Sequence, residues 1–224
     1  MISRQLKATY YAIMRLPMLL NGRLYKALRA PTHGLVRVQL GPGQKNYLPD
    51  WINVDANIVT AKCDVWANLV DPLPFHDETV DVFYSHHVVE HLPDQYLVSH
   101  FKDLYRCLKP GGMFRVGGPH GHNALQKYLQ NDLAWFGNFN HHHESIGGKL
   151  VNFIFCRNEH LTLLTPSYLE EITQAAGFKR LAICEPTRTT TNPALIDQRV
   201  LNMEYESTFD TPHTLIIEGY KPGV

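Results

Sequence analysis

The chain has 224 residues, of which 44% are hydrophobic and 19% charged, a composition typical of a folded protein and not of a disordered one. Lysine plus arginine and aspartate plus glutamate number 21 each, so the formal net charge is zero and no overall field attracts nucleic acid. The length fits one α/β domain with a full core. We therefore expect a globular protein that does not bind nucleic acid.

Residues 1–34 form a basic arm, since the first acidic residue of the chain is Asp50. Apolar and basic side chains intersperse there, which favours an amphipathic helix. Pro17 and the Asn21-Gly22 pair interrupt the apolar run well short of the ~20 residues that a bilayer span needs. Two interpretations remain: a helix packed on the edge of the domain with its charges in water, or an arm lying on an anionic membrane.

Residues 35–224 alternate short apolar runs with helical patterns, which predicts an α/β domain with a mainly parallel sheet. We expect seven strands, at Val36–Leu40, Trp51–Val54, Cys63–Trp66, Val80–Ser85, Met113–Val116, Leu181–Cys184 and Thr214–Gly219.

Two helices between these strands carry clear start and stop signals. The first begins at Pro93 and ends at the Lys-Pro-Gly-Gly run of residues 109–112. The second has Thr165 as its N-cap, Pro166 at its first position and Gly177 just after its end.

Residues 117–160 are rich in His, Asn and Gly and have no clear period, so we expect an insertion of loops over the acceptor side of the site. Its His141-His142-His143-Glu144 run suggests a metal site, because imidazoles and carboxylates bind zinc and iron. Consecutive residues rarely all face one ion, and no HExxH spacing is present. We predict no metal site; a set of His120, His122, His160 and one histidine of the run is the alternative.

The four cysteines are far apart in sequence, with no CxxC pair and no secretory signal pattern before them. Reduced thiols in a cytoplasmic protein are the expected state of Cys63, Cys107, Cys156 and Cys184.

Two short motifs follow the first two predicted strands. Gly41 and Gly43 make a Gly-x-Gly turn, which lets the backbone approach a ligand without a Cβ clash, and Asp55 closes the next strand, where an acid can accept hydrogen bonds from a ribose diol. Either feature alone is equally compatible with an ordinary turn or strand end.

Five motifs in order carry a family resemblance. The succession of Gly-Pro-Gly (41–43), Trp-Ile-Asn-Val-Asp (51–55), Leu-Pro-Phe (73–75), His-Val-Val-Glu-His (87–91) and Leu-Lys-Pro-Gly-Gly (108–112) resembles the type 11 group of class I S-adenosylmethionine-dependent methyltransferases. The resemblance implies a doubly wound, Rossmann-like sheet of seven mostly parallel strands with an antiparallel last strand. It also implies S-adenosylmethionine as the cofactor.

The resemblance assigns cofactor-binding roles to seven residues. Gly41 and Gly43 would pass under the methionine moiety, and Asp55 would hold the ribose. Asn68 and Leu69 would flank the adenine. Ser85 and His86, at the end of the fourth strand, would lie beside the methyl group.

The chain departs from the family pattern at four places. One is Asn68, which stands where many relatives have an acid near the adenine. Gln39 stands where many relatives have an acid, and Lys45 stands where a third glycine is usual. Only ten residues separate Leu40 from Trp51, so the first crossover helix must be a single turn or missing.

The implied reaction is methyl transfer to a small molecule or a glycan, with a hydroxyl oxygen as the expected acceptor atom. A hydroxyl acceptor needs a base, and histidine suits that role near neutral pH. His120, on the acceptor side, is the favoured candidate and His87 the second, while Glu90 is expected to tie the strand end to its neighbours. Two alternatives stay open: a non-catalytic binding or scaffold module, suggested by the departures at residues 39 and 45, and a metal-dependent enzyme built on the histidine run.

Overall fold

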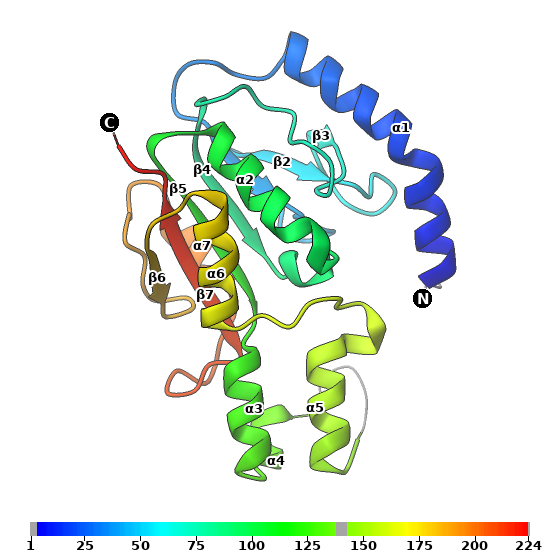
Figure 1. Ribbon diagram of the computed structural model, residues 1–224, viewed down its shortest axis with the longest axis vertical. Coiled ribbons are helices and arrows are strands. Elements are labelled where there is room, and N and C mark those ends of the chain that lie inside the picture. Colours follow the sequence, from blue (N-terminus) through cyan, green and yellow to red (C-terminus); the bar gives the residue numbers. More distant parts are fainter. Residues whose placement is uncertain (1–3, 138–142, 224) are drawn as a thin grey trace.

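The computed structural model describes residues 4–137 and 143–223. It contains one seven-stranded sheet with the strand order β3-β2-β1-β4-β5-β7-β6 (Figure 1). Only β7 runs antiparallel to its neighbours, β5 and β6. The strands are β1 (Arg37–Leu40), β2 (Ile52–Asp55), β3 (Val65–Trp66), β4 (Val80–His86), β5 (Leu108–Pro119), β6 (Leu181–Cys184) and β7 (Thr214–Tyr220). All seven predicted strands and the antiparallel last strand are confirmed.

Helices α2 (Leu97–Cys107) and α6 (Pro166–Ala176) cover one face of the sheet (Figure 1). The predicted signals act as expected in α6: the Thr165 hydroxyl accepts a hydrogen bond from the backbone N–H of Tyr168, and Gly177 ends the helix at φ 111°. A single turn of 3-10 helix, η2 (Asp94–Tyr96), precedes α2. The apolar side chains of both helices join the main core of the domain.

The opposite face of the sheet has a thinner cover. No helix links β1 to β2, as the short connection predicts, and Leu48 and Trp51 of that connection pack on the sheet instead. They meet the short helix α7 (Gln198–Asn202) in a second apolar cluster. Helix α7 contributes the side chains of Val200 and Leu201 to this cluster.

An ion network with no exposed side chain lies beside that second cluster. Arg115 on β5 stands directly opposite Glu218 on β7, and its guanidinium contacts Glu218 at 2.6 Å and Glu204 at 2.6 Å. All three side chains are 0% exposed. Because charges buried in this way need partners, the network holds Glu204, which follows α7, against the antiparallel strand β7.

Residues 4–28 form the predicted helical arm, as one helix, α1 (Arg4–Leu28), that runs along the β3 edge of the sheet (Figure 1). Its inner face is anchored: Met18 is 1% exposed, the Tyr10 hydroxyl donates to the carbonyl of Ala56, and Arg15 pairs with Asp71 at 2.7 Å. Among the described helices, none is long and apolar enough to cross a membrane.

The prediction of loops across residues 117–160 is wrong. The insertion holds three helices, α3 (Gly121–Leu129), α4 (Leu133–Phe136) and α5 (Ile146–Phe155), followed by the 3-10 turn η3 (Cys156–Asn158). They extend beyond the end of β5 (Figure 1) and bury a small core of their own around Trp135 and Phe136. That core comes from contacts between helices, which no local period reveals.

Candidate active site

The carboxyl ends of β1, β2 and β4 meet at one edge of the sheet. Leu40, the last residue of β1, is in register with Val54 on β2 and with Ser85 on β4. The strand order reverses between β1 and β4, and ligands of open α/β sheets bind in the crevice at such a switch point. The sheet therefore collects the loops that follow these strands around one candidate site.

Gly41 and Gly43 shape the turn after β1. Both have positive φ, 65° and 58°, which a residue with a side chain adopts only at a cost. A Cβ on Gly41 would lie 2.5 Å from Cγ2 of Val88, so this glycine is required for packing. A Cβ on Gly43 would meet no heavy atom within 4 Å, so the turn leaves open space beside it.

Asp55 is linked directly to that turn. Its Oδ2 accepts a hydrogen bond from the backbone N–H of Gly43 at 3.2 Å, and Oδ1 accepts from the N–H of Asn57 at 2.8 Å. Burial raises the pKa of Asp55, while these backbone donors oppose the rise. Each oxygen keeps a second lone pair, which a pair of neighbouring hydroxyl groups could fill.

Ser85 and His86 bring unpartnered polar atoms to the end of β4. Within the described chain, neither Oγ of Ser85 nor Nε2 of His86 has a hydrogen-bond partner, although both atoms are buried. Desolvation, assisted by His87 and Arg115, lowers the pKa of His86 to about 3, so its ring is neutral. Buried polar atoms without partners are rare in folded proteins and mark a place where a ligand can bind.

Asn68 and Leu69 follow β3, next in the sheet to β2. Oδ1 of Asn68 accepts a hydrogen bond from the N–H of Val70 at 3.2 Å, and the carbonyl of the buried Leu69 accepts one from Nδ1 of His100 at 3.1 Å. Asn68 also lines a cavity of about 400 Å³ between α1 and residues 67–77, which holds the basic groups of Arg23, Lys26 and Arg106. The turn glycines, Asp55, Ser85 and His86 are not part of the lining of that cavity. The cavity is therefore distinct from the crevice between β1 and β4.

His87, directly after β4, forms a close pair with Glu90. Its Nδ1 lies 2.9 Å from Oε1 of Glu90, whose side chain is 0% exposed, while the ring of His87 is 45% exposed. Burial alone would raise the pKa of Glu90, but the hydrogen bond and charge of His87, together with His91, outweigh it and lower that pKa. A carboxylate can only accept, so Nδ1 of His87 carries the proton and Nε2 keeps a lone pair.

The backbone at His87 is in the left-handed region, at φ 55°. Non-glycine residues with such angles are uncommon, and they concentrate at functional sites where the surroundings hold them in place. Here the hydrogen bond from the N–H of His87 to the carbonyl of Gly117 and the Glu90 contact supply that support.

His120, the favoured base candidate, lies at the N-terminus of α3 and has a structural use. Its Nδ1 accepts a hydrogen bond from the N–H of Asn123 at 3.3 Å, so the lone pair of the neutral ring caps the helix. Desolvation, together with His122, lowers the pKa of His120 to about 4. A base needs a free lone pair, so the geometry favours His87 over His120.

The side chains that could bind a metal are grouped differently from the set of His120, His122, His160 and one histidine of residues 141–143 that the sequence suggested. His141 and His142 lie outside the described residues, and His143 is exposed. In the described part of the chain, the ligand atoms of Glu90, His91 and His160 lie within 4.8 Å of one another. Sequence reasoning missed this group because His91 and His160 are 69 positions apart, and no spacing motif connects them.

Comparisons with known proteins agree with this architecture. Residues 21–116 match the family model described as a methyltransferase domain. The chain is similar to a solved S-adenosylmethionine-dependent methyltransferase from Archaeoglobus fulgidus, with 19% identity, a TM-score of 0.52, and coverage of 95% of this chain and 100% of that one. It is also similar to one from Thermotoga maritima, with 17% identity, a TM-score of 0.52, and coverage of 96% and 94%.

A third similar structure is phosphoethanolamine N-methyltransferase 2 of Haemonchus contortus, solved in complex with S-adenosyl-L-methionine. It has 14% identity and a TM-score of 0.50, over 98% of this chain and 57% of that one. No curated protein matches the sequence. At these identities the solved structures establish the fold, and the methyltransferase-domain model matches 96 of the 224 residues.

Proposed function

We propose that the chain is an S-adenosylmethionine-dependent methyltransferase and that it methylates a hydroxyl oxygen of a small molecule or a glycan. The match of residues 21–116 to a methyltransferase domain and the fold shared with solved methyltransferases support the first part. The observation that carries the choice of oxygen is the pair of His87 and Glu90 at the carboxyl end of β4. An amine acceptor can react without a base once its proton is lost to water, whereas a hydroxyl acceptor benefits from a base in the site.

The residues at the switch point fit the cofactor. Gly43 leaves room for a ligand against the backbone, and Asp55 has lone pairs for two ribose hydroxyl groups. Ser85 and His86 offer buried polar atoms that lack partners in the described chain. When bound, S-adenosylmethionine supplies a methyl group on a positively charged sulfur. The acceptor oxygen would bond to the methyl carbon as the bond from carbon to sulfur breaks.

His87 is the proposed base. Glu90 fixes the tautomer in which Nε2 is free to take the hydroxyl proton, and its negative charge stabilises the imidazolium that results. The half-exposed ring allows an acceptor from solvent to reach Nε2. Positioning contributes the remaining rate enhancement. An acceptor held in line with the methyl group and the sulfur has already lost the entropy that a reaction in water would lose in its transition state.

The test is methyl transfer from labelled S-adenosylmethionine to a panel of sugars, glycans and small alcohols, with the matching amines as controls. The proposal predicts product from hydroxyl compounds, with mass spectrometry locating the methyl group on oxygen. A methyl group on nitrogen would contradict the choice of acceptor. Cofactor binding without transfer to any acceptor would favour the non-catalytic binding or scaffold module.

The outer face of α1 supports a proposal about where the enzyme works. Six large apolar side chains spaced by three, four or seven residues lie on that face and are 50–75% exposed: Leu6, Ile13, Leu16, Leu20, Leu24 and Leu28. The helix sequence also has five basic residues and no acidic one. An exposed apolar stripe on a helix of net positive charge is complementary to the surface of an anionic bilayer. We propose that α1 lies on the cytoplasmic surface of such a membrane.

Vesicle sedimentation tests this contact with the full chain. We expect binding to phosphatidylcholine vesicles that contain phosphatidylglycerol, and more than tenfold weaker binding by the Leu20→Ser, Leu24→Ser double variant. Leu129→Ser, which changes an 83% exposed leucine of α3, is the matched control and should bind normally. Equal binding by all three proteins would contradict the proposal, and so would a dimer on gel filtration that only the double variant loses.

A further inference from the structure

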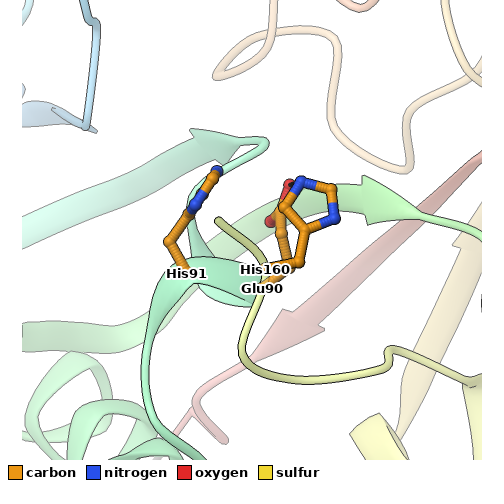
Figure 2. A group of neighbouring side chains, drawn as sticks. All are labelled: Glu90, His91 and His160. Carbon is orange, nitrogen blue, oxygen red and sulfur yellow. Dashed lines mark ion pairs between the residues drawn. The ribbon is translucent and has the colours of Figure 1, made fainter. Parts of the chain in front are cut away.

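A cluster of Glu90, His91 and His160 lies beside the candidate base. Glu90 and His91 belong to the 3-10 turn η1 (Val89–His91), and His160 follows η3 about 70 positions later in the chain (Figure 2). The backbone N–H of Leu161 donates to the carbonyl of Glu90 at 2.7 Å, which holds the two segments together. The potential ligand atoms of the three side chains all lie within 4.8 Å of one another.

Both imidazoles of the cluster are oriented by backbone carbonyls. Nδ1 of His91 lies 2.9 Å from the carbonyl of Glu159, and Nδ1 of His160 lies 3.0 Å from the carbonyl of Ile154. A carbonyl only accepts, so Nδ1 carries the proton in both rings and Nε2 keeps its lone pair. A hydrogen bond from the second ring nitrogen to a carbonyl is the arrangement that orients histidine ligands in metal sites.

The carboxylate of Glu90 has one oxygen engaged and one unpartnered. Oε1 contacts His87 at 2.9 Å and lies 3.9 Å from Nε2 of His160. Oε2 is buried and has no hydrogen-bond partner in the described chain. Oε1 is the oxygen nearest to His160, and a cation held there would offset the cost of burying the carboxylate charge.

We propose that Glu90, His91 and His160 bind a divalent transition-metal ion. Two imidazoles and one carboxylate form a donor set that suits zinc and iron and leaves coordination positions for water or a substrate oxygen. His87 then acts in the outer shell, because a ligating carboxylate is itself hydrogen-bonded in such sites. His91 is exposed, so an ion can enter from solvent.

Metal titration of the chelator-treated full chain tests this site without any assay of activity. Calorimetry with Zn²⁺ and the visible absorption of added Co²⁺ should both show one ion per chain. His91→Ala, His160→Gln and Glu90→Gln should each weaken Zn²⁺ binding at least tenfold. His33→Ala, which removes an exposed histidine between α1 and β1, is the matched control and should leave the affinity unchanged.

His91→Ala keeps the test decisive if the variants of the two buried residues fail to fold, because His91 is on the surface. Absence of a stoichiometric ion in the wild-type chain would overturn the proposal. Equal affinity in the wild type and His91→Ala would also overturn it, since the ion would then lie elsewhere, for example at the histidine run of residues 141–143.

Discussion

Nδ1 of His87 lies 2.9 Å from Oε1 of Glu90, and the two residues are three positions apart on the turn that ends β4. One member of the pair is fully buried and the other is half exposed. A buried acceptor with a solvent-facing donor is the geometry of a base held by an orienting carboxylate.

Replacing His87 tests its role as the base. His87→Asn should lower kcat by about 10²- to 10⁴-fold, the usual contribution of general base catalysis, with little change in the affinity for S-adenosylhomocysteine. The measurement is the initial rate of methyl transfer with the acceptor found in the panel, beside a calorimetric Kd. His122→Asn, an exposed histidine of α3, is the control; an equal rate in His87→Asn and wild type would assign the base elsewhere.

Replacing Asp55 tests the placement of the ribose. Asp55→Ala removes both carboxylate oxygens and should weaken binding of S-adenosylhomocysteine by about 1–3 kcal/mol, the scale of lost charge-assisted hydrogen bonds. Asp77→Ala, which removes an acid whose side chain is 69% exposed, should bind like the wild type. Unchanged affinity in Asp55→Ala, measured by calorimetry, would contradict the assignment.

Replacing Arg115 tests the buried ion network. Arg115→Met leaves Glu204 and Glu218 buried without their cation, so the free energy of unfolding should fall by about 3–5 kcal/mol. Urea unfolding monitored by circular dichroism gives this value. Arg188→Met, at an exposed arginine paired with Glu185, should change it by less than about 1 kcal/mol; similar losses in the two variants would show that the network adds no stability.

The pair of His213 and Glu206 gives a pH-dependent contribution to stability. Its atoms lie 3.0 Å apart, and Nε2 of His213 also contacts the carbonyl of Trp135 in the insertion at 2.6 Å. Burial alone would raise the pKa of Glu206, but His213 and the backbone N–H groups of Thr208, Thr214 and Ser207 lower it to about 2. Burial would lower the pKa of His213, but Glu206 and Trp135 raise it overall.

The sign of each shift sets the pH window. The contribution of Glu206 is complete above its ordinary pKa of about 4.3 and is lost as the pH falls towards 2. The contribution of His213 is complete below its ordinary pKa of about 6.5 and is lost as the pH rises through its raised pKa. The difference in unfolding free energy between wild type and His213→Gln should therefore be largest between about pH 4.3 and 6.5. A difference that does not change from pH 3 to pH 9 would contradict this account.

The parts of the fold that the sequence predicts are those with local causes. Thr165, Pro166 and Gly177 set the ends of α6 through their own backbone preferences, and short apolar runs that become largely buried mark the strands. Helix α3 has no such signal, because Leu125 and Leu129 are exposed while Ala124 is buried against Trp135 of the next helix. Contacts between helices, and not local sequence patterns, therefore determine the structure of the insertion.

The same distinction holds for the site. The strand-end residues Gly41, Asp55 and Ser85 could be proposed from motif order, because parallel strands bring their carboxyl ends together. The role of His120 could not, since its capping of α3 depends on a helix that the pattern does not reveal. His160 reaches Glu90 only through tertiary packing.

Thermal unfolding with S-adenosylhomocysteine, and with NAD as the control, tests the central claim most directly. A ligand at one hundred times its Kd stabilises the folded state by about 2.7 kcal/mol, a shift of several degrees in Tm. We expect that rise with S-adenosylhomocysteine alone, and a smaller rise in Asp55→Ala at the same ligand concentration. No rise in the folded wild-type protein, or an equal rise with NAD, would contradict the assignment of this crevice to S-adenosylmethionine.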